Sequence, residues 1–188
     1  MNELIKYINR FQQTDAETEH AIKNFFVEEA YKKNDILLQE GEICNKAIYI
    51  KSGLIRRYYI QDCRDVTIWI YGPDQMATST PSFFFQKPAY EYIQACDDTV
   101  IYSLSYQNEQ ILLENFPLFE KFHLKQLRFY LAGVDEVNYR LRIMSAKEKY
   151  NFLLTYYPYI IQRAKLKHLA SFIDVSPETL SRIRSSIN

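Results

Sequence analysis

The segment from Leu166 to Ser185 carries polar residues that are suited to contacts with nucleic acid. Arg182 presents a bidentate fork that matches guanine O6 and N7, and Glu178 can accept a hydrogen bond from cytosine N4. Hydroxyl side chains and a further arginine suit phosphate oxygens, namely Ser176, Thr179, Ser181 and Arg184. The residue types therefore predict two base-reading side chains and four that position the segment on double-stranded DNA.

These side chains need a short rigid element to hold them in a DNA groove, and the apolar spacing predicts one. Apolar residues recur at short intervals on both sides of Asp174, at Leu169, Phe172, Ile173, Val175, Leu180 and Ile183. Ser176 suits an N-cap with Pro177 in the first turn, and Asp174 tolerates a left-handed turn. The pattern predicts a helix-turn-helix, whose second helix enters the major groove. An ordinary helical hairpin that closes a core is the alternative left open.

The charge distribution agrees with a DNA-binding C-terminal part. The whole chain has 23 basic and 23 acidic residues and a formal net charge of zero. From residue 140 onward there are nine basic and three acidic residues, a net charge of +6, so the preceding part carries 14 basic and 20 acidic residues, a net charge of −6. Phosphate binding requires such a basic region, although a solvated basic face without a partner would have the same composition.

Composition disfavours several other classes of protein. The 188 residues contain no apolar run near the roughly 18 residues that span a membrane, and the opening MNELIKYINRF does not resemble a secretion signal. Cys44, Cys63 and Cys96 are scattered, which argues against a disulfide framework, a zinc knuckle or a four-cysteine iron–sulfur cluster. The three histidines lie outside the strand-like region, so metal-dependent enzyme chemistry is not expected. We expect a cytoplasmic protein with no membrane contact, no metal and no enzymatic activity.

Strand-like patterns fill the chain from about residue 31 to residue 105. The runs DILLQEG, KAIYIKSGLIRRYYI, DVTIWIYGP, YEYIQAC and TVIYSLS are rich in β-branched and aromatic residues and are separated by turn residues. Gly41 and Gly53 are expected to hold turns with positive φ. Several short strands with regular turns predict an antiparallel sandwich or barrel.

Helical periodicity precedes and follows the strands. Residues Asn2 to Glu29 are expected to form a helix pair, in which Thr14 or Asp15 caps the second helix. A long helix is expected from Phe116, and a further helix from Ser145 to Tyr157. The predicted fold class is therefore α+β.

The long helix carries a regular apolar seam. Its members are spaced alternately three and four residues apart: Leu124, Leu127, Leu131, Val134, Asn138 and Leu141. Such an a/d pattern predicts a parallel two-stranded coiled coil, and a polar Asn138 at an a position can fix its register. Phe119, Phe122 and Phe129 lie off the seam and are expected to pack against the barrel. A homodimer follows, with a buried helix in a monomer as the alternative.

Two sequences, SPETLSRIR in the C-terminal segment and IYIKSGLIRRYYI at Ile48 to Ile60, resemble the catabolite-activator and fumarate-nitrate-regulator (Crp/Fnr) transcription factors. The resemblance extends over nearly the whole chain. It implies a jelly-roll sensor domain with the N-terminal helices at 1–115, a dimerisation helix at 116–145 and a helix-turn-helix DNA-binding domain at 146–188. The chain has Pro177 where relatives often have a base-reading arginine, and it stops at Asn188, which implies a short type without the two-stranded wing.

The resemblance also frames the question of an effector. Relatives that bind cyclic nucleotides carry a Gly-Glu pair and an Arg-Ser pair that this chain lacks between Pro73 and Ala95, and no arginine occurs between Arg64 and Arg128. A buried phosphate needs such a cation, so binding of cyclic AMP is not expected and no cofactor is predicted. Aromatic and hydroxyl residues offer a pocket for an unknown small effector that is neutral or aromatic: Trp69, Tyr71, Thr78, Ser79, Thr80, Ser82 and Tyr92. A barrel filled by its own aromatic side chains is the favoured alternative.

These patterns together predict a homodimeric, sequence-specific transcription regulator that binds a palindromic operator. An effector or partner in the barrel would alter the helix seam and hence the spacing of the recognition helices. RNA polymerase is a further expected partner. The alternative function is a dimeric ligand-binding or protein-interaction module that does not bind DNA.

Overall fold

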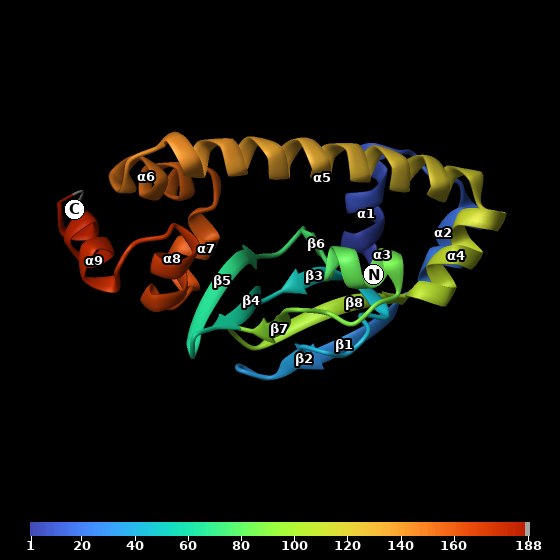
Figure 1. Cartoon of the computed structure of the whole chain (residues 1–188). Coiled ribbons are helices and arrows are strands. Elements are labelled where there is room, and N and C mark those ends of the chain that lie inside the picture. The colour runs from blue at the N-terminus through green and yellow to red at the C-terminus, as the bar shows by residue number, and fades with distance from the viewer. Residues whose placement is uncertain (187–188) are drawn as a thin grey trace.

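Eight strands in residues 1–186, which the computed structural model describes, form two four-stranded antiparallel sheets (Figure 1). The strands are β1 (Val27–Tyr31), β2 (Ile36–Leu38), β3 (Lys46–Ser52), β4 (Ile55–Gln61), β5 (Arg64–Tyr71), β6 (Met76–Ala77), β7 (Tyr92–Ala95) and β8 (Thr99–Ser105). One sheet has the order β1-β8-β3-β6 and the other β2-β7-β4-β5, which is the arrangement of a double-sheet jelly roll. The predicted antiparallel sandwich is therefore confirmed.

Helices lie at both ends of the jelly roll, and one long helix runs above the sheets from one end to the other (Figure 1). They are α1 (Asn2–Phe11), α2 (Ala16–Phe25), α3 (Thr80–Phe85), α4 (Tyr106–Asn115), α5 (Pro117–Ile143), α6 (Ala146–Tyr156), α7 (Pro158–Arg163), α8 (Leu166–Phe172) and α9 (Pro177–Ser185). Within residues 1–186 no helix is both long enough and apolar enough to cross a membrane.

Local chemistry explains several of these boundaries. Asp15 caps α2, because its carboxylate accepts a hydrogen bond from the backbone N–H of Thr18 at 2.8 Å. Gly53 has a φ of +90°, as predicted, and a Cβ there would lie 2.4 Å from the side-chain oxygen of Thr99. The turn between β3 and β4 therefore requires glycine for both its conformation and its space.

The structure corrects three expectations about secondary structure. Val27 to Glu29 belong to β1 rather than to a helix, because they pair with β8 in the sheet. The six-residue α3 and the ten-residue α4 lie where no helix was predicted. Helix α3 is too short to show a helical period, and α4 has a weakly amphipathic sequence, so tertiary packing rather than pattern defines them.

The first part of α5 is anchored in the core, whereas its middle is not. Phe119 and Phe122 are buried with residues of α1, α2 and the first sheet, as predicted. Phe129 is 69% exposed, so the prediction that it packs against the barrel is wrong. Its ring meets Phe11 of α1 at 5.6 Å instead, because α5 passes above the sheets at this point (Figure 1).

The C-terminal helices share one hydrophobic core with the second sheet. Phe172 of α8 packs edge-on against Trp69 of β5 with ring centroids 5.3 Å apart, and Figure 1 shows the two elements side by side. The backbone N–H of Thr67 donates to the hydroxyl of Ser171 at 2.9 Å. The helices from α6 onward are thus docked on the jelly roll of their own chain.

Candidate functional site

The predicted recognition segment forms two helices joined by a tight turn. Asp174, between α8 and α9, has a φ of 57°, the left-handed conformation expected of it. Ser176 caps α9, since its hydroxyl accepts from the backbone N–H of Thr179 at 3.1 Å, and Pro177 stands in the first turn. Local sequence therefore determines how α9 begins and in which direction it leaves the turn.

Helix α9 buries one side and presents the other to solvent. Leu180 is fully buried in the core shared with α6 and α8, which fixes the rotation of the helix. Glu178, Ser181 and Arg182 are exposed, whereas Thr179 and Arg184 are half-buried. The guanidinium of Arg182 lies 3.4 Å from the hydroxyl of Thr179. The structure thus gathers all six predicted DNA-contacting residues on one helix and its cap.

The exposed carboxylate of Glu178 lies in the first turn of α9. The pKa of Glu178 is lowered by its own backbone N–H at the start of the helix, and further by Ser176 and Arg182. A carboxylate at a helix N-terminus is stabilised in this way. Glu178 is therefore an ionised acceptor at neutral pH.

The predicted dimer seam divides into two rows along α5. Leu124, Leu131 and Asn138 are exposed, at the a positions of the heptads. The d positions turn toward the body of the same chain: Leu127 and Val134 line hollows beneath the helix, and Leu141 packs against the C-terminal core. Leu124 is 50% and Leu131 70% exposed, which leaves an apolar row on the outside of α5.

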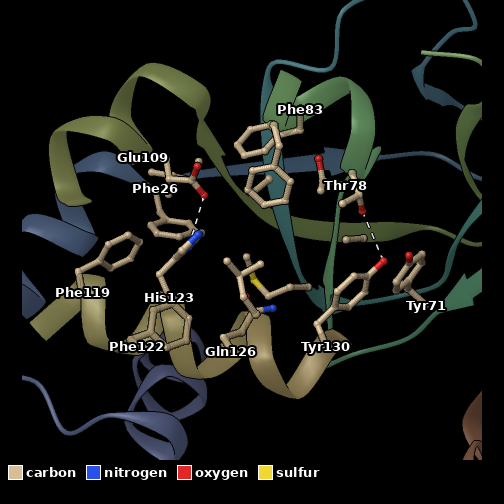
Figure 2. Close-up of a pocket in the computed structure, with 17 residues that line it drawn as sticks. Phe26, Tyr71, Thr78, Phe83, Glu109, Phe119, Phe122, His123, Gln126 and Tyr130 are labelled. Carbon is tan, nitrogen blue, oxygen red and sulfur yellow. Dashed lines mark hydrogen bonds and ion pairs between the residues drawn. The ribbon is translucent and has the colours of Figure 1, made fainter. Parts of the chain in front are cut away.

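Part of the predicted effector pocket lines a narrow hollow between the jelly roll, α3, α4 and α5 (Figure 2). Tyr71, Thr78 and Thr80 contribute to its walls, and the phenol of Tyr130 on α5 lies 3.4 Å from the hydroxyl of Thr80. The hollow has a volume of about 60 Å³, room for roughly two water molecules. It is a small site as the structure stands.

The other four residues of the predicted pocket lie elsewhere. Ser79 and Ser82 are buried at the start of α3, where the hydroxyl of Ser82 accepts from the backbone N–H of Cys44 at 2.8 Å. Tyr92 stacks on Tyr58 with ring centroids 5.0 Å apart. Trp69 lies between α8 and a second, wider hollow beneath α5.

Two titratable residues of the narrow hollow were not predicted from the sequence. Glu109 of α4 is buried, and its carboxylate lies 3.7 Å from the imidazole Nδ1 of His123 on α5 (Figure 2). Burial raises the pKa of Glu109 to about 7 and lowers the pKa of His123. The pair therefore favours its uncharged form, and a proton can enter or leave the pocket near neutral pH. Because α4 was not predicted, Glu109 was not expected beside His123.

The jelly roll also buries a cation that was not predicted, because it lies on β4 and not in the segment between Arg64 and Arg128. Arg57 of β4 contacts Glu91 through Nη2 at 2.8 Å and Nε at 3.0 Å. Its Nη1 donates to the hydroxyl of Tyr71 at 3.1 Å, and burial raises the pKa of Tyr71 to about 12. Arg57 is thus neutralised by its own chain, and among the described residues that line the narrow hollow only His123 has a cationic form.

One family model matches the β-rich part of the chain. Residues 28–116 match the family model described as a cyclic nucleotide-binding domain. A comparison with curated protein sequences finds no significant match.

Solved structures share the fold over most of the chain. The c-di-GMP-responsive global regulator CLP of Xanthomonas campestris has a TM-score of 0.67 at 16% identity, over 92% of this chain and 91% of CLP. The catabolite activator protein of Thermus thermophilus has a TM-score of 0.58 at 17% identity, covering 94% and 85% of the two chains. A regulator assigned to the Crp/Fnr family from Eubacterium rectale has a TM-score of 0.68 at 15% identity, covering 93% and 83%. A jelly roll followed by a long helix and a C-terminal group of helices is common to them.

Proposed function

We propose that this chain is a homodimeric, sequence-specific DNA-binding transcription regulator of the Crp/Fnr type. The observation that carries the proposal is helix α9, which is capped by Ser176, anchored by Leu180 and exposes Glu178 and Arg182 on the outside of the molecule. A helix held in this way can enter the major groove with two side chains that discriminate bases. The similarity of the fold to solved regulators supports the same function.

The proposal assigns three parts of the chain to three tasks. Residues 1–115 form the sensor, 116–145 the dimerisation helix and 146–188 the helix-turn-helix domain, of which the last two residues lie outside the described part. Two copies joined along α5 place two recognition helices on one face, so a roughly palindromic operator is expected. The exposed row of Leu124, Leu131 and Asn138 supports this seam.

The effector proposed for the narrow hollow is a small uncharged molecule. Arg57, the cation inside the roll, already pairs with Glu91, so an anionic phosphate would have to displace a buried carboxylate. Glu109 and His123 instead offer a hydrogen-bonding pair that prefers to be neutral. Binding would bias the position of α5, because both Tyr130 and His123 belong to that helix.

The test is selection from random duplex DNA with the purified protein, followed by affinity measurements on the selected duplex at two salt concentrations. We expect a palindromic sequence and an affinity that falls steeply with salt, since phosphate contacts release counterions. Arg182→Ala should cost about 1–3 kcal/mol of binding free energy and relax preference at one base position of each half-site. Arg184→Ala is the matched control: it should weaken binding to all sequences alike and reduce the salt slope by about 1.

Two results would contradict the proposal. If no duplex is enriched, with or without cell extract as a source of effector, the interaction-module function takes its place. If a duplex is enriched but Arg182→Ala binds it with unchanged affinity and preference, α9 is not the reading element.

A further inference from the structure

A second, wider hollow lies beneath the middle of α5. The helix passes above the sheets between α4 and α6 (Figure 1), and the hollow under it is bounded by α1, by the segment that joins β5 to β6 and by the end of α6. Its volume is about 470 Å³, within the range of roughly 300–1,000 Å³ that is usual for small-molecule sites. It differs from the narrow hollow in most of its walls, although Tyr71, Met76, Gln126 and Tyr130 border both.

The walls of this hollow are formed mainly by aromatic rings. Tyr7 and Phe11 belong to α1, Trp69 to β5 and Phe129 to α5, and Tyr157 directly follows α6. Trp69 and Tyr157 meet edge to face with centroids 6.5 Å apart, and Phe11 and Phe129 do so at 5.6 Å. Rings from four separate elements thus surround one space, and such walls favour a flat aromatic ligand through stacking and edge contacts.

The charges of the hollow limit the ligand further. Among the described residues that line it, Arg10 and Asp74 alone are charged, and they form an ion pair of 3.5 Å at the exposed rim. Asp74 is also held by the hydroxyl of Tyr49 at 2.5 Å. The two charges neutralise each other, and the amides of Gln75 and Gln126 add only uncharged polar groups to the wall. The hollow therefore suits a ligand without net charge.

Gly133 keeps the hollow open from the side of α5. A glycine inside a helix costs about 1 kcal/mol relative to alanine, so a packing reason is usually found for it. Here a Cβ at position 133 would meet no atom within 4 Å, which shows that close packing does not require glycine. The missing side chain instead leaves its space to the hollow that Gly133 lines.

We propose that this hollow is a binding site for an uncharged planar aromatic molecule of two to four fused rings. The site is distinct from the exposed side of α9 and adjoins the narrow hollow, with which it shares part of its wall. Its walls include Trp69 of the sensor sheet and Tyr157 beside the C-terminal helices, so an occupant would contact both parts of the chain at once.

Fluorescence of Trp69 provides the test, because it is the only tryptophan of the chain. The full chain is titrated with 1-aminoanthracene, a three-ring amine that is uncharged at neutral pH. We expect saturable quenching of Trp69 with matching enhancement of the probe. Gly133→Leu should weaken binding at least tenfold by filling the space, whereas Gly133→Ala, which gains the same helix propensity, should bind within about threefold of the wild type. Anthracene-1-sulfonate, with similar rings and one negative charge, should bind at least tenfold more weakly.

Each other outcome would overturn the proposal. Equal binding by wild type, Gly133→Ala and Gly133→Leu would assign the probe to another site, and tighter binding of the sulfonate would reject the uncharged class. Absence of saturable quenching in a wild-type protein that is dimeric by light scattering would mean that the second copy fills the hollow. Circular dichroism monitors folding, and Gly133→Met replaces Gly133→Leu should the latter fail to fold.

Discussion

The molecule buries two glutamates, and their surroundings differ. Glu91 is fully buried beside Arg57, which meets both of its carboxylate oxygens. Glu109 is also buried, and its one ion-pair contact within residues 1–186 is with the imidazole of His123, at 3.7 Å. An ionised carboxylate in a protein interior needs a paired cation, and without one the group takes up a proton instead. Glu91 therefore belongs to a buried ion pair, whereas Glu109 is expected to titrate near neutral pH.

The difference follows the positions of the two residues in the fold. Glu91 and Arg57 lie within the jelly roll, where the pair links strand β4 to the residue just before β7. Glu109 and His123 lie on α4 and α5, at the hollow between the roll and the long helix. A change of charge at Glu109 is thus expected to act on the contact between the jelly roll and α5, whereas the Glu91 pair contributes to the stability of the jelly roll itself.

Breaking the Glu91 pair should have the largest effect on stability. Arg57→Ala leaves a buried carboxylate without its cation, and we expect it to lower the free energy of unfolding by about 3–5 kcal/mol, measured by urea denaturation at fixed protein concentration. The double variant Arg57→Met, Glu91→Leu removes both charges and should be much closer to the wild type. If the single variant is as stable as the double one, loss of the Arg57 contact at Glu91 does not destabilise the fold.

Glu109→Gln should change how stability depends on pH. The pKa of Glu109 is about 7 in the folded protein against 4.5 for the ordinary group. A raised folded-state pKa contributes stability that is complete below pH 4.5 and is lost as pH rises through 7, at most about 3 kcal/mol. The glutamine variant lacks this loss, so its stability relative to the wild type should rise between pH 5 and pH 8.

The matched control for this profile is Glu114→Gln, an exposed glutamate on the same helix. Urea denaturation of the three proteins at four pH values between 5 and 8 gives the comparison. His123, whose pKa is lowered by burial, destabilises the fold below its ordinary pKa in the wild type and in Glu114→Gln alike, so its contribution cancels between these two proteins. A Glu109→Gln profile parallel to that of the wild type would mean that the carboxyl group is not titrating in this range.

The sequence predicted what local chemistry determines. The cap at Ser176, the left-handed turn at Asp174 and the long helix from Pro117 all depend on residues close together in the chain, and the structure has each of them. The strand-rich region was predicted for the same reason, since alternation and β-branched residues are local signals.

What the sequence missed depends on contacts between distant segments. Arg57 and Glu91 are 34 residues apart and meet only because β4 pairs with β7. Glu109 was missed together with α4. The weakly amphipathic sequence of α4 does not indicate a helix, and packing against the neighbouring elements defines it. The exposed position of Phe129 likewise follows from the path of α5 above the sheets rather than from its own residue type.

A half-buried ion pair extends the comparison to a third carboxylate. Lys46 of β3 contacts Glu29 of β1 at 2.8 Å, and the two side chains keep 22% and 29% of their surface exposed. Lys46→Met should lower the free energy of unfolding by only about 1 kcal/mol in the same denaturation assay, because water continues to solvate Glu29 after the cation is lost. Lys51→Met, at a more exposed contact with Glu28, is the control and should have a still smaller effect. A loss at Lys46 as large as that of Arg57→Ala would show that pairing, rather than depth of burial, sets the cost at all of these carboxylates.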